Sequence, residues 1–367
     1  MKILSVTTAL PQNDAECTRI LNIAKLMEKN GIKIKLVHYI IKGSNNYEMF
    51  KKRSFKGTFL AHKPLTLMFK HLNVLRSEDY DLVYGNTFIA TFFCILGKLM
   101  KKQLILDMHG ISEESYFFGN SRILSFFVKI MEMITLLCSN KILCVSYEMV
   151  DHLHNKKRVP RNKLFYIPNG VDLDFFKQKN KNQVTALRKK YKLENKLIFG
   201  YLGGIHKWQG FENFIEASKE INNNKFASVI VGCNISQYKQ KDNITYIPRV
   251  SKNEIVDYYS LCDILVLPRP KHIVTEVAAP TKFAEYTSMS KPILTTDVGD
   301  AAKFVKKYEN GLVVENNDLE NLKNGINQFL IMDRDKITQM AQNSRKLAEN
   351  EFDWNRISID LNKILRN

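Results

Sequence analysis

The segment APTKFAEYTSMSKPILTT, residues 279–296, decides the fold of this chain. It follows an apolar run, DILVLPRP (263–270), and its own pattern predicts a short buried helix that leads into a buried strand. A short apolar strand, a helix and a second short apolar strand are typical of a parallel sheet covered by helices. The segment therefore predicts one strand–helix–strand unit of an α/β domain.

The same alternation of strands and helices continues on both sides of this segment. Further apolar strands are predicted at residues 2–8, 32–38, 81–86, 103–110, 141–146, 196–204, 227–233 and 243–247. A polar stretch at 173–195 interrupts the rhythm. We therefore predict two doubly wound Rossmann-like α/β domains facing each other across a cleft, at 1–172 and 173–350, followed by a helix at 351–367.

Length and composition indicate a soluble globular protein of two domains. The 367 residues are 45% hydrophobic and 25% charged. Six scattered cysteines (17, 94, 138, 144, 233 and 262) form no CxxC pair, so we expect reduced core residues of a cytoplasmic protein. The N-terminal apolar run is too short for a signal peptide. The longest apolar run, 123–138, contains Lys129 and Glu132 and does not suit a membrane-spanning helix.

The formal net charge of +18 indicates an anionic partner, a phosphate-bearing substrate or simply a solvated basic face. Nucleic acid is not expected, because the chain has no zinc knuckle, aromatic RNA-binding strand or arginine-rich helix. The densest basic stretch, KKRSFKGTFLAHK (51–63), places lysines among Phe55, Phe59 and Leu60. That pattern suits a contact with an anionic membrane surface, and it suits an ordinary surface loop equally well.

Lys282 and Glu285 are the first candidates for chemistry. Pro280 suits the first turn of a helix, so Thr281 and Lys282 are expected where free N–H groups form an anion site. Glu285, one turn later, shares the face of Lys282 and could accept hydrogen bonds from the diol of a ribose. A diphosphate joined to a ribose is a nucleotide. The alternative is a surface Lys–Glu pair of the kind that helices carry routinely.

Several further stretches give the chain a family resemblance. They are LILDMHG (104–110), ILCVSYEM (142–149), FYIPNGVDLDFF (165–176), YYSLCDILVLP (258–268), NGLVVENNDLENL (310–322) and FDWNRISIDL (352–361). With these stretches in this order, nearly the whole chain resembles the retaining glycosyltransferases of family 4, which have the GT-B architecture. The resemblance implies an acceptor-binding first domain, a second domain that holds a nucleotide-diphosphate-sugar, and a C-terminal helix that returns to the first domain.

The resemblance also assigns roles to single residues. It implies that Glu285 binds the nucleotide ribose, that Lys282 faces the diphosphate, and that His109 touches a donor hydroxyl near the reacting sugar carbon. Other contacts to the nucleotide-sugar are expected from Gly203, Gly204, Lys207, Arg249, Val250, Pro280 and Thr281. Asn169 and Gly170 correspond to a turn that faces the cleft, although forming the turn explains them equally well.

The chain departs from the family pattern at three places. Val277 stands where many relatives have a first glutamate, and Glu276 lies one residue earlier. The basic pair of the family is missing from GGIHKWQG (203–210), where Gly204 and Gln209 occupy those positions; Lys207 or Lys282 could replace the lost charge. The N-terminal loop lacks the usual double glycine, which leaves Thr8 and Ala9 as weak candidates for phosphate contacts.

We therefore expect a metal-independent hexosyltransferase without a cofactor that acts on a glycan or lipid-linked acceptor in the assembly of cell-surface polysaccharide or glycoconjugate. Its location is expected to be cytoplasmic, with a peripheral contact at the inner membrane face left open. A nucleotide-sugar 2-epimerase of the same fold and a non-catalytic nucleotide-binding protein at a membrane surface are the alternatives. A dehydrogenase is disfavoured because no GxGxxG follows either first strand.

Overall fold

A computed structural model describes residues 1–10, 15–52, 57–96, 100–204, 206–232 and 243–366. The chain divides into two compact units. The first contains Met1–Pro168 together with Trp354–Asn367, and the second contains Asn169–Asp353. The C-terminal helix therefore belongs to the same unit as the N-terminal strand.

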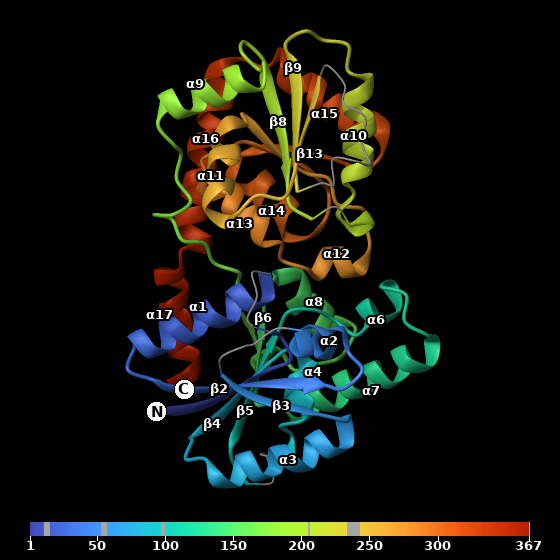
Figure 1. Cartoon of the computed structure of the whole chain (residues 1–367), viewed down its shortest axis with the longest axis vertical. Coiled ribbons are helices and arrows are strands. Elements are labelled where there is room, and N and C mark those ends of the chain that lie inside the picture. The colour runs from blue at the N-terminus through green and yellow to red at the C-terminus, as the bar shows by residue number, and fades with distance from the viewer. Residues whose placement is uncertain (11–14, 53–56, 97–99, 205, 233–242, 367) are drawn as a thin grey trace. The chain divides into compact units, whose positions relative to one another are not determined.

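The described part of the first unit has a seven-stranded sheet in the order β3-β2-β1-β4-β5-β6-β7 (Figure 1). Every neighbouring pair in it is parallel. The strands are β1 (Lys2–Thr7), β2 (Lys33–Ile41), β3 (Thr58–His62), β4 (Leu82–Asn86), β5 (Gln103–Met108), β6 (Lys141–Cys144) and β7 (Leu164–Tyr166). The order changes direction between β1 and β4, which is where ligands bind in open parallel sheets.

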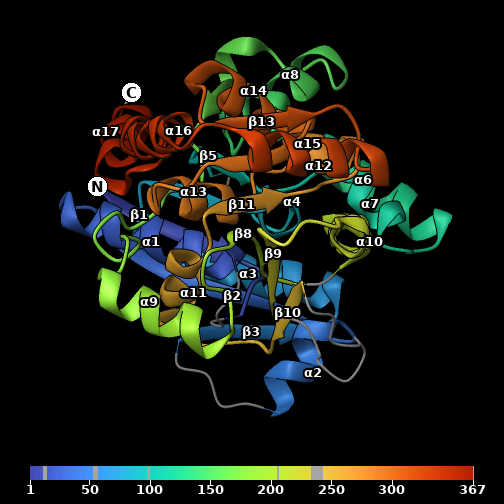
Figure 2. The ribbon, with the colours of Figure 1, turned by 90° about the horizontal axis from the view of Figure 1, so that it is seen from above.

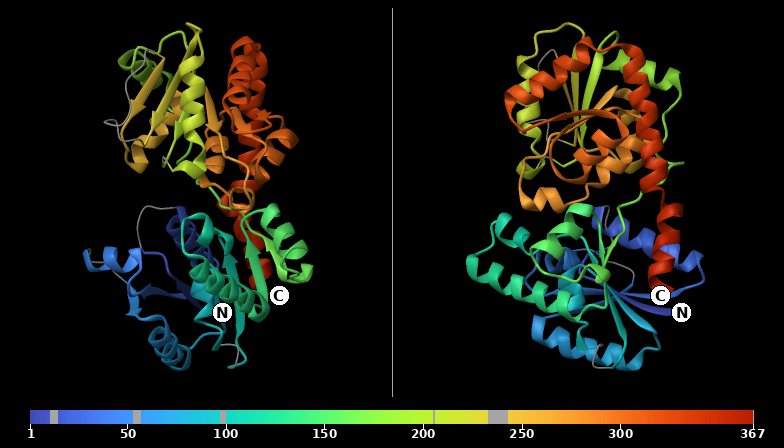
Figure 3. Two further views of the ribbon diagram at one scale, coloured as in Figure 1. Left: turned by 90° about the vertical axis from the view of Figure 1, so that its right-hand side faces the viewer. Right: turned by 180° about the vertical axis from the view of Figure 1, so that it is seen from behind.

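Helices cover both faces of this sheet. Helix α1 (Ala15–Lys29) lies beside α17 (Trp354–Arg366) on one face, as the rear view in Figure 3 shows. Leu361 of α17 packs with Ile23 of α1 and Tyr84 of β4 in the core on that side. The remaining helices of the unit are α2 (Asn45–Lys52), α3 (Pro64–Ser77), α4 (Phe88–Phe92), α6 (Glu113–Phe117), α7 (Arg122–Cys138) and α8 (Tyr147–Asn155), with a 3-10 turn, η1, at Arg161–Lys163.

The described part of the second unit has a six-stranded parallel sheet in the order β10-β9-β8-β11-β12-β13. The strands are β8 (Leu197–Leu202), β9 (Phe226–Val231), β10 (Ile244–Ile247), β11 (Ile264–Leu267), β12 (Ile293–Thr296) and β13 (Gly311–Val314). All residues of β8, β9 and β11 are buried, which explains why these strands are almost entirely apolar. The direction of the strand order changes between β8 and β11.

Helices α10 (Phe211–Glu220) and α15 (Leu319–Ile331) pack together on one face of the second sheet (Figure 2). Phe214 of α10, Phe329 of α15 and Phe199 of β8 are central to the core between them. The other helical segments are α9 (Lys181–Lys190), η2 (Lys207–Gln209), α11 (Lys252–Leu261), α12 (Ile273–Val277), α13 (Thr281–Ser288), α14 (Gly299–Tyr308), α16 (Arg334–Leu347) and a π-helical turn at Ala348–Phe352.

The predicted fold class is confirmed, because both units are doubly wound parallel sheets. Two local interpretations need correction. The stretch 51–63 is not simply a loop, since Thr58–His62 form the edge strand β3. The polar stretch 173–195 contains the helix α9. Among the described cysteines, Cys17, Cys94, Cys144 and Cys262 are buried as expected, and Cys138 is half-buried; Cys233 lies outside the described residues.

Candidate functional site

The carboxyl end of β8 and the first turn of α13 bring Lys282 against Gly203. Pro280 is the N-cap of α13, so Lys282 is the second residue of the helix. Its Nζ donates hydrogen bonds to the Tyr201 hydroxyl at 3.0 Å and to Gln209 Oε1 at 3.3 Å. Gly203 has a φ of 141°, and a Cβ there would lie 2.7 Å from Lys282 Nζ. The position therefore needs glycine for two reasons: the positive φ is strained for other residues, and a Cβ would collide with the Lys282 ammonium.

The Lys282 ammonium has no direct ion-pair partner in the described part of the chain, and the Glu285 charge only partly opposes the fall of its pKa. Among the described residues, no carboxylate lies within ion-pair distance of it. Removal from water lowers the pKa of Lys282 from its ordinary 10.5 to about 7, and the neighbouring Arg269 cation acts in the same direction. An anion bound beside this amine would favour its charged form. The geometry is therefore that of an anion site.

Glu285 lies one turn further along α13 and is held by a tyrosine from α11. The Tyr259 hydroxyl donates to Glu285 Oε2 at 2.6 Å. Burial raises the pKa of Glu285 above its ordinary value, although the Tyr259 hydrogen bond and the Lys282 charge oppose that rise. Within the described residues, Oε1 accepts no hydrogen bond. The carboxylate is thus fixed at one oxygen and can accept hydrogen bonds at the other.

Arg269 is a site residue that the sequence analysis missed. It lies two residues after the end of β11, and only 4% of its surface is exposed. Its guanidinium carbon lies 5.1 Å from the centre of the Trp208 ring, and Nη1 donates to the Thr275 carbonyl oxygen at 3.3 Å. Its charge also acts to lower the pKa of Lys282. A basic residue close to the carboxyl end of a buried strand was the available signal.

The sequence predicts four further contacts to the nucleotide-sugar in the second unit, at Gly204, Lys207, Arg249 and Val250. Gly204 follows Gly203, and its carbonyl oxygen accepts a hydrogen bond from the Tyr201 hydroxyl at 2.6 Å. The side chain of Lys207 lies outside the described residues. Arg249 is exposed and Val250 is half-buried in the loop between β10 and α11, and among the described residues no hydrogen bond or ion pair joins either of them to Lys282.

The turn at Asn169 supports the start of α13, because Asn169 Nδ2 donates to the Ala279 carbonyl oxygen at 2.6 Å. Gly170, beside it, is half-buried. Val277, which stands at the first-glutamate position of the family, is completely buried. Glu276 is half-buried on α12, and its carbonyl would lie 2.5 Å from a Cβ at Gly299. No hydrogen bond or ion pair joins its carboxylate to Lys282 within the described residues.

In the first unit, His109 follows β5 and lies beside a buried carboxylate. His109 Nε2 is 3.3 Å from Asp107 Oδ2. Asp107 is completely buried and accepts hydrogen bonds from Arg19 Nη2 at 2.8 Å and from the Tyr84 hydroxyl at 2.8 Å. Burial alone would raise the pKa of Asp107, but Arg19 and then His109 hold it well below its usual value. Asp107 and Arg19 were not among the predicted site residues.

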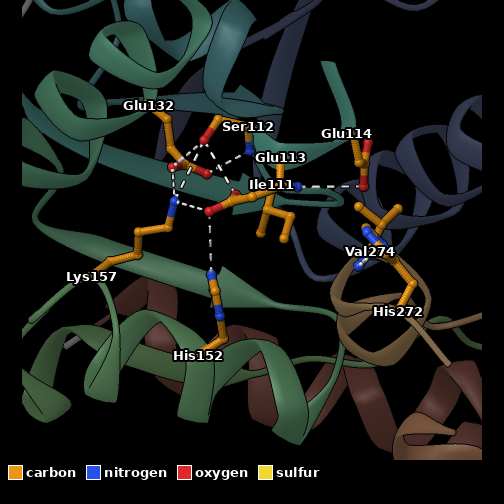
Figure 4. A network of polar contacts seen from close by, with 9 residues as sticks. All are labelled: Ile111, Ser112, Glu113, Glu114, Glu132, His152, Lys157, His272 and Val274. Atoms are coloured by element: carbon orange, nitrogen blue, oxygen red, sulfur yellow. Dashed lines mark hydrogen bonds and ion pairs between the residues drawn. The ribbon is translucent and has the colours of Figure 1, made fainter. Parts of the chain in front are cut away.

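The loop after His109 is anchored by a polar network, drawn in Figure 4. Glu132 of α7 accepts hydrogen bonds from the Ser112 backbone N–H at 2.8 Å and from its hydroxyl at 2.7 Å. Lys157 pairs with Glu132 at 2.8 Å and with Glu113 at 2.6 Å. Burial would lower the pKa of Lys157, but the two carboxylates, Glu132 first, hold it above its usual value. The network fixes the backbone three residues beyond His109.

The switch point of the first sheet also carries a strained residue. Thr87, directly after β4, has φ 73° and ψ 153°, a region that only glycine adopts easily. Its backbone N–H donates to the Asp107 carbonyl oxygen at 2.8 Å. Thr8, after β1, accepts a hydrogen bond from Asn46 at 2.7 Å through its carbonyl oxygen, and Ala9 is buried.

Within the described residues, no three His, Cys, Asp or Glu side chains are arranged to hold a metal ion.

Comparisons with known proteins place both halves of the chain in glycosyltransferase families. Residues 18–175 match the family model Glycosyltransferase Family 4, and residues 183–347 match Glycosyl transferases group 1. An uncharacterized glycosyltransferase of Methanocaldococcus jannaschii is 24% identical over 342 residues, which cover 87% of each chain. The UDP-Gal:alpha-D-GlcNAc-diphosphoundecaprenol alpha-1,3-galactosyltransferase of Escherichia coli is 24% identical and covers 76% of this chain and 73% of its own.

The fold comparison agrees with the family models. The crystal structure of Anabaena HepE in complex with UDP matches with a TM-score of 0.77 and 17% identity, and covers 100% of both chains. The same Anabaena protein has been solved with UDP-glucose. The two family models match successive parts of the chain and leave only residues 1–17, 176–182 and 348–367 unmatched. The chain therefore carries two glycosyltransferase family matches, one after the other, and has the GT-B fold of two Rossmann-like domains.

Proposed function

We propose that this glycosyltransferase moves a hexose from a nucleotide-diphosphate-sugar to a glycan or lipid-linked acceptor, with retention of anomeric configuration and without a metal ion. The observation that carries the donor assignment is the Lys282 ammonium at the switch point of the second sheet. It is held by Tyr201 and Gln209 at the N-terminal turn of α13, and no described carboxylate pairs with it. Retention follows the resemblance to family 4.

The chemistry requires cations where Lys282 and Arg269 lie. Cleavage of the bond between sugar and phosphate develops negative charge on the departing diphosphate. Lys282 and the free N–H groups of the first turn of α13 would stabilise that charge in the transition state. Arg269, whose charge already acts on Lys282, would supply the second cation in place of the missing basic pair. Glu285 Oε1 would accept hydrogen bonds from the ribose hydroxyls.

His109 is proposed to contact a donor hydroxyl close to the reacting carbon. Asp107 would orient the imidazole through the ring nitrogen that faces it at 3.3 Å. Arg19 keeps that carboxylate ionised, and the hydrogen bonds from Arg19 and Tyr84 hold it in place. The anchored loop at Ser112 would limit the freedom of the His109 backbone. His109 would therefore act as an orienting group for the sugar.

The relatives support the classes of donor and acceptor. The Escherichia coli relative is named for a UDP-Gal donor and a diphosphoundecaprenol acceptor, and the Anabaena structures hold UDP or UDP-glucose. We propose a UDP-sugar donor and a lipid-linked acceptor by this likeness. Such an acceptor would place the enzyme at the cytoplasmic face of a membrane, as a peripheral protein.

Product analysis tests the function. The protein is incubated with a panel of UDP- and GDP-sugars and a polyprenyl-diphosphate-sugar acceptor, and the products are analysed by mass spectrometry and by NMR of the anomeric proton. A glycosylated acceptor, lost in Lys282→Ala and kept in the exposed control Lys336→Ala, is expected. Loss of one leaving-group contact lowers turnover by about a hundredfold to a thousandfold. Epimerised donor, or binding without turnover, would contradict the proposal.

A further inference from the structure

Helix α7 carries an apolar stripe on its outward face. The stripe consists of Ile123, Phe126, Phe127, Met133 and Leu137, which recur at intervals of three, four and seven residues. Their exposed fractions range from 54% at Met133 to 73% at Ile123. The buried side of the helix, with Thr135 and Leu136, faces the body of the unit. Figure 1 shows α7 at the margin of its unit, where it packs against α4 and α6.

This concentration of exposed apolar side chains is not a random feature of the surface. Of the fifteen exposed large hydrophobic residues in the described part of the chain, six lie on α7, namely the stripe and Leu124. Tyr116 and Phe118, on and next to the neighbouring helix α6, are exposed as well. Contiguous apolar surface of this kind marks a site that another apolar surface covers.

The charges beside the stripe are basic. The exposed charged residues of α7 are Arg122 and Lys129. Its one acid, Glu132, is 1% exposed and is turned inward to Ser112 and Lys157 (Figure 4). At the C-terminal end of the helix, Lys163 donates to the carbonyl oxygens of Leu137 and Ser139 at 3.3 and 3.0 Å. An apolar stripe accompanied by cations complements the acyl chains and headgroups of an anionic lipid surface.

We propose that the apolar stripe of α7 docks this protein onto an anionic membrane, with the helix lying in the plane of the interface. Within the described residues, no helix combines the length and hydropathy needed to cross a bilayer. A second copy of the chain is the less suitable occupant, because a symmetric contact would bring Arg122 and Lys129 of both copies to an apolar interface. This inference deepens the proposed function by naming the surface through which a lipid-linked acceptor is reached.

Vesicle sedimentation tests the docking surface directly. The wild-type protein is mixed with vesicles of phosphatidylglycerol and phosphatidylcholine, or of phosphatidylcholine alone, and the bound fraction is measured after centrifugation. Strong binding is expected only to the anionic vesicles. The double variant Phe126→Glu/Phe127→Glu is expected to bind about a hundredfold more weakly. Lys129→Glu should weaken binding about fivefold, an effect that added salt removes.

Ile331→Glu is the matched control, because Ile331 is equally apolar and 87% exposed but lies on α15 of the other unit. It should bind vesicles as the wild type does. Circular dichroism and UDP affinity of all variants, measured on the same preparations, verify that they are folded. Vesicle binding without UDP binding would overturn the proposed function and leave the docking surface standing.

Two results would overturn the docking proposal. The first is wild-type protein that stays in the supernatant with anionic vesicles while it still binds UDP. The second is a wild-type dimer in sedimentation velocity that the Phe126→Glu/Phe127→Glu variant converts to monomer, which would show that a second copy covers the stripe.

Discussion

Replacing Lys282 by methionine should stabilise the unliganded protein and abolish diphosphate binding. The unfolded chain holds the Lys282 proton with a pKa near 10.5, whereas in the folded protein that pKa is about 7. Each unit of difference corresponds to about 1.4 kcal/mol. At about pH 7 the amine therefore costs the folded state about 4 kcal/mol as an upper limit, and methionine of similar length removes that cost.

The size of this stabilisation depends on pH. Between about pH 7 and pH 10.5 the unfolded chain binds the proton that the folded protein releases, so the stability of the wild type rises with pH. Below about pH 7 both states are protonated, and the destabilisation is complete. The advantage of Lys282→Met should therefore be greatest at or below about pH 7 and should vanish above about pH 10.

Urea unfolding measures the difference in the free energy of unfolding between the wild type and Lys282→Met. The experiment is done at about pH 7 and about pH 10 and includes the exposed control Lys336→Met. Thermal shift with UDP, performed in parallel, should raise the melting temperature of the wild type and of the control only. A Lys282→Met protein that is less stable than the wild type at about pH 7 would show that the amine is structural. A variant that keeps its UDP affinity would show that Lys282 does not bind the diphosphate.

Three further changes have defined outcomes. Lys157→Met removes one partner of a buried ion pair with Glu132. It should lower the free energy of unfolding, measured in urea titrations, by about 3 kcal/mol. A decrease of less than about 1 kcal/mol would show that the hydrogen bonds from Ser112 are enough to stabilise the Glu132 carboxylate. Glu285→Gln should weaken UDP about tenfold in isothermal titration and leave pyrophosphate affinity unchanged, and equal losses for both ligands would exclude contact with the ribose. His71 is completely buried without a hydrogen-bond partner in the described residues, and burial lowers its pKa to about 3. Stability should therefore fall as pH decreases from about 6.5 to about 3, and His71→Leu should reduce that slope in thermal melts; an unchanged slope would assign the acid sensitivity to other groups.

The fold was predictable because parallel strands that are buried on both faces leave continuous apolar runs in the sequence. Helix α9 was missed, because KNQVTALRKK buries no side chain and so has no apolar periodicity. The stripe on α7 was hidden for the opposite reason. That helix is apolar around most of its circumference, so the sequence alone does not tell which side faces the unit.

The site was predictable only where its residues share one helix. Lys282 and Glu285 are one turn apart on α13, and the sequence indicates both. Their partners come from other elements: Tyr201 lies 81 residues before Lys282, and Tyr259 lies 26 residues before Glu285. Sequence spacing gives no information about such tertiary neighbours. Asp107 and Arg19 were missed for the same reason, since 88 residues separate them.

A crystal structure of the protein with UDP would distinguish a diphosphate-binding Lys282 from a structural one. The β-phosphate is expected within hydrogen-bond distance of Lys282 Nζ and of the first N–H groups of α13, with the ribose hydroxyls on Glu285. UDP bound elsewhere, with Lys282 Nζ still donating only to Tyr201 and Gln209, would contradict the proposed donor site.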